Sequence, residues 1–112
     1  MLDWHDCGTA VVNTEQVTVV RIYLHEAKGQ VAGLLRYLHD EHKVRGVTVF
    51  RGITGFGTSG KYHSSSLMDM SLDLPVIIEF YDESTKVAAI VEELGRTIKP
   101  GHIVYWPAST NG

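Results

Sequence analysis

The sequence predicts an α+β domain, in which a four-stranded antiparallel sheet carries two helices on one face. Three observations predict this class. Four segments show the alternating or continuous apolar pattern of strands, two others repeat apolar residues at helical spacing, and the order is strand, helix, strand, strand, helix, strand. Two such halves form the ferredoxin-like βαββαβ arrangement. At 112 residues, the chain has the length of one domain.

The first half of the chain contains a strand, a helix and a second strand. From Val17 to Leu24 apolar residues occupy both parities, which is the pattern of a strand covered on both faces. Gly29 interrupts this run. A helical stripe at i, i+3, i+4 and i+7 follows, formed by Val31, Leu34, Leu35 and Leu38. The second strand is expected from Gly46 to Ile53.

The second half repeats this pattern. The third strand is the most regular, because apolar residues keep one parity from Met68 to Phe80. Pro75 cannot donate to a strand ladder, so we expect it at an edge or a bulge. Asp82 or Ser84 is expected to cap the second helix, and Gly95 to end it. The stripe of that helix is Val87, Ile90, Val91 and Leu94. The last strand is expected over residues 102–106.

The predicted arrangement leaves one sheet face without helices. We expect residues 17–106 to form the domain, residues 1–16 a leader and residues 107–112 a polar tail. The bare face is expected to show apolar side chains of the first two strands, namely Val17, Val19, Tyr23, Val47 and Val49. Exposed apolar patches of this size mark interfaces, so the pattern indicates a homo-oligomer whose sheets face each other. The alternative is that the leader folds across this face.

Composition excludes several classes of protein. Ten Lys and Arg stand against thirteen Asp and Glu, a net charge of -3, which does not favour nucleic acid as a partner. No apolar run approaches the ~20 residues of a membrane span, so no membrane insertion is expected. The first residues lack a signal-peptide pattern, which makes the cytoplasm the expected location. Cys7 is the single cysteine, which excludes an internal disulfide.

A glycine-rich segment after the second strand is the first candidate binding element. Between Arg51 and Lys61 the chain reads Gly52-Ile53-Thr54-Gly55-Phe56-Gly57-Thr58-Ser59-Gly60. Glycines let backbone N–H groups converge on an anion, and the two flanking residues add positive charge. The segment leads to a strand, so it has no helix N-terminus to aim at phosphate. The alternative is a flexible hairpin loop, because glycine clusters are mostly turns.

The link from the second helix to the last strand is the second candidate. It reads Lys99-Pro100-Gly101-His102. A lysine beside a Pro-Gly turn could meet phosphate oxygens as a point charge. The alternative is a solvated lysine at a helix end.

The histidines and nucleophiles form no set that predicts catalysis. His39 and His42 stand three apart on the first helix, a spacing that can hold a metal, but such a site needs a third ligand. The alternative is a pair of surface histidines. His63 precedes the serines at 64–66, yet adjacency in sequence is not triad geometry. We therefore predict no catalytic residues, no resident metal and no enzyme.

Three runs of residues carry a resemblance to a known family. They are Arg51-Gly52-Ile53-Thr54-Gly55-Phe56-Gly57, His63-Ser64-Ser65, and Leu72-Asp73-Leu74-Pro75-Val76-Ile77-Ile78-Glu79. From about Val17 to Tyr105 the chain resembles the PII-like proteins grouped as domain of unknown function 190. The Gly55-Phe56-Gly57 step also resembles the start of the T-loop of PII signalling proteins. The resemblance implies a ferredoxin-like subunit, a homotrimer and no catalysis.

The resemblance also implies where a ligand binds. In PII relatives, adenine nucleotides bind in clefts between subunits, lined by the T-loop base and by the turn after the second helix. Gly55, Phe56 and Gly57 match that base, and Lys99 and Gly101 fall in that turn. The other candidate ligand-binding residues are Arg51, Gly52, Lys61 and His63. The leading hypothesis is a non-enzymatic regulator that binds a small anionic ligand such as ATP, ADP, AMP or a cyclic nucleotide. It would signal through the loop to a transporter or a metabolic enzyme.

Two other functions are kept as alternatives. His25, His39, His42 and His63 motivate a divalent-metal-binding trimer on the same scaffold, like the CutA proteins. A small enzyme that uses His63 and the loop serines is the weakest reading. No cofactor is expected in the leading hypothesis.

Overall fold

The computed structural model describes residues 13–25, 29–56, 62–64 and 74–111, with side chains outside 54–56 and 62–64. Four strands form one antiparallel sheet: β1 (Glu15–His25), β2 (Val47–Arg51), β5 (Pro75–Glu83) and β6 (Ile103–Thr110). Their order across the sheet is β2-β5-β1-β6. Strands β3 (Thr54–Phe56) and β4 (Tyr62–Ser64) pair as a small hairpin inserted between β2 and β5.

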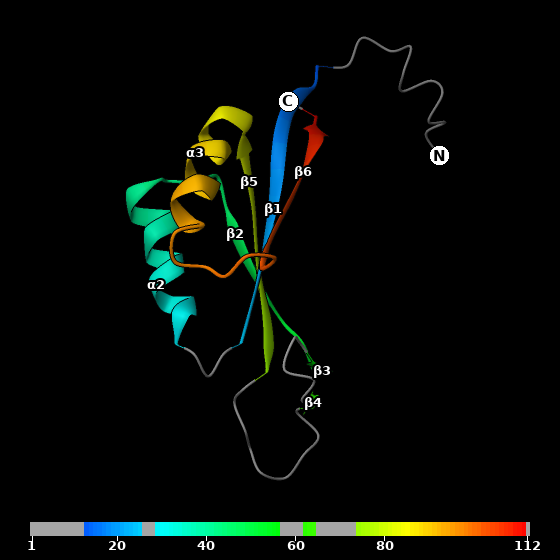
Figure 1. Ribbon diagram of the computed structural model, residues 1–112. Helices are drawn as coiled ribbons and strands as arrows, with labels where there is room; N and C mark the ends of the chain where they lie inside the picture. The colour runs from blue at the N-terminus through cyan, green and yellow to red at the C-terminus, as the bar shows by residue number, and fades with distance from the viewer. Residues whose placement is uncertain (1–12, 26–28, 57–61, 65–73, 112) are drawn as a thin grey trace, which may run out of the picture.

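Both helices cover the same face of this sheet (Figure 1). Helix α2 (Gln30–Arg36) continues into a π-helical turn, Tyr37–Glu41, and connects β1 to β2. Helix α3 (Ser84–Leu94) follows β5 directly and leads to β6. The order and the layers confirm the predicted ferredoxin-like α+β class. Among the described residues, no helix is long and apolar enough to cross a membrane.

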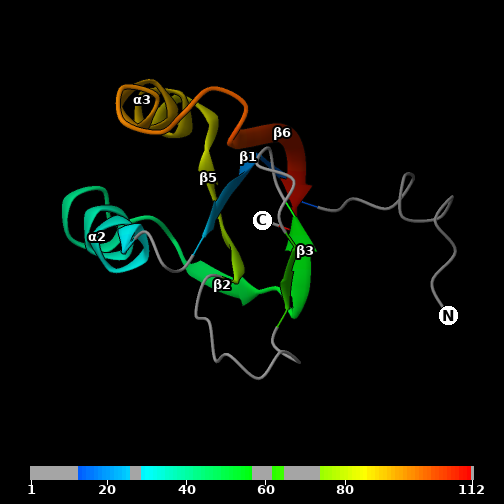
Figure 2. The ribbon, with the colours of Figure 1, turned by 60° about the horizontal axis from the view of Figure 1, so that its bottom comes forward.

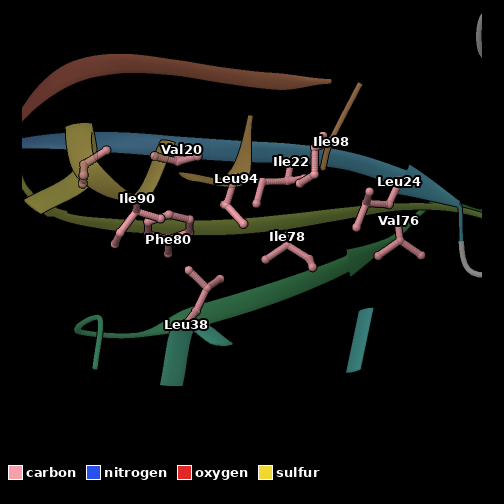
Figure 3. Close-up of a cluster of buried hydrophobic side chains, with 11 residues drawn as sticks. Val20, Ile22, Leu24, Leu38, Val76, Ile78, Phe80, Ile90, Leu94 and Ile98 are labelled. Carbon is pink, nitrogen blue, oxygen red and sulfur yellow. The ribbon is translucent and has the colours of Figure 1, made fainter. Parts of the chain in front are cut away.

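The core lies between the sheet and the two helices. It is built from alternate residues of β1 and β5 and from the apolar stripes of the helices (Figure 3). The buried members are Val20, Ile22, Leu24, Leu38, Val76, Ile78, Phe80, Val87, Ile90, Leu94 and Ile98. Because successive strand residues point to opposite faces, the other parity of each strand is left for the open face.

The register corrects our assignment for β2. Val47 pairs with Phe80 and Val49 with Ile78, so both valines lie on the helix side of the sheet and not on the open face. Phe50, which pairs with Ile77, is the β2 aromatic on the open face. Val17, Val19 and Tyr23 have the predicted parity, although Val17 is buried.

Three strand and helix ends also differ from expectation. Pro75 is the first residue of a central strand, where its missing N–H costs no ladder bond, and not at an edge or bulge. The N-cap of α3 is Glu83, whose side chain accepts a hydrogen bond from the Thr85 amide. Strand β6 continues to Thr110, beyond the predicted end at Trp106, because an edge strand tolerates Pro107.

A buried carboxylate ties the α2–β2 connection to α3. Asp82 is 4% exposed and receives hydrogen bonds from the backbone amides of Glu83 and Arg45. Lys86 Nζ lies 3.1 Å from Asp82 Oδ2, and the Arg45 guanidinium pairs with both Asp82 and Glu15. Burial alone would raise the pKa of Asp82, but the Glu83 amide and Lys86 outweigh it and hold that pKa below its usual value.

Candidate functional site

The glycine-rich segment leaves the sheet at the end of β2 and bends into the β3–β4 hairpin. Gly52 makes this exit possible by close approach: a Cβ there would lie 2.7 Å from the Pro75 Cγ. Its amide donates a 2.7 Å hydrogen bond to the Pro75 carbonyl, which fixes the end of β2 against the start of β5. Figures 1 and 2 both show the hairpin beyond the sheet, on the side away from the helices.

The hairpin brings three predicted residues together. Gly55 pairs with His63, and Phe56 pairs with Tyr62. Exposed Arg51 ends β2 just before the hairpin. Gly57 and Lys61 lie outside the described residues, as do most of the predicted leader and the start of the predicted third strand. The hairpin does not decide between the anion-binding and the hairpin-loop interpretation of this segment.

The turn before β6 is held by hydrogen bonds to β1. Gly101 has φ +85°, a left-handed conformation that favours glycine. The His102 amide donates to the Lys99 carbonyl at 3.2 Å, and the Tyr23 amide donates to the His102 carbonyl at 2.9 Å. The Nδ1 of His102 is 3.0 Å from the Tyr23 carbonyl, which can only accept, so Nδ1 carries a proton. This leaves the Lys99 side chain exposed on a fixed turn.

The two candidate elements adjoin opposite edge strands of the sheet. Arg51 is on edge strand β2, and His102 leads into edge strand β6, with β5 and β1 between them. Three strand spacings of about 4.8 Å separate the edges by roughly 14 Å. Figure 2 shows the α3–β6 link and the β2–β3 segment on either side of β5 and β1. The two elements are therefore not adjacent within the sheet of one chain.

His39, in the π-helical turn, and His42, which follows that turn, take part in contacts within the chain. His39 Nδ1 lies 2.7 Å from the adjacent Asp40 carboxylate. The π-helical turn places His42 against Tyr37, with Nε2 2.8 Å from the phenol oxygen, and the phenol donates to Glu93 of α3. The hydrogen bond from Tyr37, reinforced by His42, lowers the pKa of Glu93. Burial and then Glu93 raise the pKa of Tyr37.

These contacts bear on the metal hypothesis. Within the part of the chain that the structure describes, no three His, Cys, Asp or Glu side chains gather as potential metal ligands. Sequence reasoning missed the Tyr37–His42–Glu93 cluster, because an i, i+5 contact needs the wider π-helical turn that periodicity does not reveal.

Sequence reasoning also missed a charged pair in the middle of the open face. Arg21 Nε donates to Glu79 Oε1 at 2.7 Å, across the β1–β5 pair. A signal was present, since Arg21 shares the parity of Val19 and Tyr23, and Glu79 has the parity opposite to the core residues of its strand. Only the pairing of β1 with β5 shows that the two charges meet.

Comparison with known proteins identifies the family. The sequence profile of DUF190, described as Uncharacterized ACR, matches residues 17–110. This chain belongs to the DUF190 family. A UPF0166 protein of Aquifex aeolicus is 34% identical over 65 residues, which cover 58% of this chain and 68% of that protein. UPF0166 protein MJ1524 of Methanocaldococcus jannaschii is 30% identical over 91 residues, covering 77% of this chain and 82% of the relative.

Solved structures similar to this DUF190 chain include CPII, a nitrogen regulatory PII-like protein from Thiomonas intermedia K12. The form bound to ADP and bicarbonate has a TM-score of 0.60, at 19% identity over 89% of this chain and 91% of that one. The form bound to ADP, AMP and bicarbonate has a TM-score of 0.62, with the same identity and coverage. At this identity the likeness establishes the PII-like fold of the DUF190 chain, as the sequence resemblance predicted.

Proposed function

We propose that this DUF190 chain is a non-enzymatic, PII-like regulator. It binds an adenine nucleotide in clefts between the subunits of a homotrimer and signals occupancy through the loop carried by β3 and β4. The carrying observation is the separation of the strands that lead to the candidate elements: β2, which runs into the glycine-rich hairpin, and β6, which follows the Lys99 turn, are the opposite edges of one sheet. A cleft between copies is the arrangement that lets one ligand meet both. The ADP and AMP bound to CPII support the choice of ligand.

Each element supplies a different part of phosphate recognition. The guanidinium of Arg51 can pair with two phosphate oxygens at once, whereas the Lys99 ammonium acts as a point charge. Gly52, Gly55 and Gly57 let the backbone approach the ligand closely. Phe56, Lys61 and His63 are assigned to the hairpin side of the cleft, and Gly101 shapes the opposite turn. The role that we propose for these groups is binding and not catalysis.

Signalling follows from a shift in the conformations of the loop. A ligand that prefers one loop conformation shifts the population by no more than its difference in affinity between conformations. The selected conformation would then be recognised by a partner protein, a transporter or a metabolic enzyme. This step needs only that the phosphates make better contacts with one loop conformation than with the other.

Calorimetry with ATP, ADP, AMP and cyclic AMP tests the proposal. At least one nucleotide should bind with micromolar to millimolar affinity. Lys99→Ala should weaken binding about 10- to 100-fold, the range for losing one hydrogen bond to a charged group. Lys43→Ala is the matched control, because Lys43 precedes β2 at the other end of the sheet and should leave affinity unchanged. No heat with any nucleotide at millimolar concentration would overturn the proposal.

A second variant separates nucleotide binding from the metal alternative. Gly55→Ala should weaken nucleotide binding by blocking close backbone approach, whereas affinity for Zn²⁺ held by histidines would be largely unchanged. Micromolar Zn²⁺ binding that is lost in His63→Ala would favour the CutA-like reading instead.

A further inference from the structure

His102 closes the turn that leads into β6, and β1 holds its imidazole in place. Its Nδ1 lies 3.0 Å from the Tyr23 carbonyl oxygen, and its own carbonyl accepts a 2.9 Å hydrogen bond from the Tyr23 amide. Because a carbonyl oxygen can only accept, Nδ1 keeps its proton in the neutral ring as well as in the charged one. The protonation of this half-buried side chain can therefore change only at Nε2.

The surroundings of His102 leave Nε2 open to a ligand. The two ring nitrogens point in diverging directions, so Nε2 faces away from the Tyr23 carbonyl. Among the described residues, none forms a hydrogen bond with Nε2, and no carboxylate pairs with His102. In the neutral ring Nε2 can only accept a hydrogen bond, whereas in the charged ring it donates one. A ligand anion next to Nε2 therefore meets a donor only after a proton has been added.

The turn places a second cation beside this nitrogen. The 3.2 Å hydrogen bond from the His102 amide to the Lys99 carbonyl closes a four-residue turn. Gly101, at the third position, has φ +85°, the value of a type II turn. The first and last Cα atoms of such a turn lie within about 7 Å of each other. The exposed Lys99 side chain and the His102 imidazole can therefore reach the same anionic group.

We propose that His102 takes up a proton when the phosphates of a nucleotide bind at this turn, so that binding strengthens as pH falls. This inference rests on the proposed function, which brings those phosphates to the Lys99 turn. A nearby negative charge favours the charged form of an imidazole. Histidine ordinarily changes its charge between pH 5 and 8, so the proton exchange takes place in the physiological range.

The charges around the imidazole explain why the proton and the ligand bind together. The other titratable or charged groups near His102 are Lys99 in the turn, Tyr23 and His25 on β1, and Arg96 after α3. Arg96 lies 3.9 Å from a carboxylate of α3, with which it pairs. In the free chain the Lys99 ammonium disfavours a second positive charge on the turn. Phosphates between Lys99 and His102 replace this repulsion with two attractions.

Calorimetry of the full chain with ADP at pH 7, in buffers of different ionisation enthalpy, measures the proton uptake. His102→Asn is the test variant, because its amide can still donate to the Tyr23 carbonyl but takes up no proton. The unmodified chain should take up about 0.3–0.8 proton more than this variant, since the ADP phosphates contribute equally to both. Its advantage in affinity over the variant should be about three- to tenfold larger at pH 6 than at pH 8.

The outcomes separate this inference from the proposed function. His39→Asn is the matched control, because His39 lies in the π-helical turn after α2 and pairs with Asp40, so proton uptake should be unchanged. Equal uptake by the unmodified chain and by His102→Asn overturns only this inference, whereas no heat with any nucleotide overturns both. If His102→Asn does not fold or bind, His102→Lys decides. That variant is charged throughout this pH range, so it should bind ADP without the extra proton, and an uptake equal to that of the unmodified chain contradicts the proposal.

Discussion

The exit of the chain at Gly52 allows a sharp prediction about stability. An alanine Cβ at this position would lie 2.7 Å from Pro75 Cγ and 3.3 Å from the Pro75 carbonyl oxygen. Carbon atoms in favourable contact lie about 3.5–4.0 Å apart, so the end of β2 and the start of β5 must separate by roughly 1 Å. The proline ring cannot rotate away as a flexible side chain could. The separation also stretches the 2.7 Å hydrogen bond from Gly52 to Pro75.

The expected cost of Gly52→Ala is about 2 kcal/mol. Overpacking costs about 1–3 kcal/mol, and the weakened hydrogen bond costs up to about 1 kcal/mol. The lower conformational entropy of the unfolded alanine variant offsets about 0.4–1 kcal/mol of this cost. With an unfolding entropy near 2.1 cal/mol/K per residue, 1 kcal/mol corresponds to roughly 4 °C in this chain. The variant should therefore melt about 8 °C lower.

Thermal unfolding followed by circular dichroism measures this shift. Gly33→Ala is the matched control, because Gly33 lies in α2 with no atom within 4 Å of its added Cβ. It should raise the free energy of unfolding by about 0.5–1 kcal/mol through helix propensity. A Gly52→Ala variant that melts at or above the temperature of the unmodified chain would refute the close-approach argument.

Three further substitutions probe the core and the charged clusters. Leu38→Ala empties a fully buried site and should cost about 2–5 kcal/mol in urea unfolding. Asp82→Asn should lower the free energy of unfolding at neutral pH and make that free energy less dependent on pH in the acid range. Because the pKa of folded Asp82 is lowered, its contribution is present above the unfolded pKa of about 3.9 and is lost as pH falls through the folded pKa. Tyr37→Phe should let the pKa of Glu93 rise toward its ordinary value, as measured by NMR titration.

The sequence was sufficient for the elements that bury a regular stripe. Alternation predicted that Val20 and Ile22 of β1 face the core. Helical spacing predicted that Ile90 and Leu94 of α3 pack into the same core. The prediction of which residues face the core failed for β2, because that short strand has apolar residues of both parities. A one-residue change of register moves every side chain of a strand to the other face of the sheet. Only pairing with β5 resolves which face each residue takes.

The candidate site shows a similar limit of local patterns. Glycine spacing and flanking charge selected the hairpin and the Lys99 turn, but nothing in their sequences says that β5 and β1 lie between them. Sheet order depends on contacts between distant segments, so it is not visible in any single motif. The separation of the two elements is nevertheless what makes a shared site between copies the simplest hypothesis.

That separation can be tested by mixing two defective variants. Arg51→Ala removes charge from the β2 edge and Lys99→Ala from the turn before β6, so each homo-oligomer should bind nucleotide weakly. If each cleft takes one edge from each of two copies, mixed oligomers regain a cleft with both residues intact. Random mixing gives about one quarter of such clefts in a head-to-tail ring. Calorimetry after unfolding and refolding the mixture should then detect tight sites at that fraction. A site contained within one chain would show none, because every subunit would still lack one of its two charges.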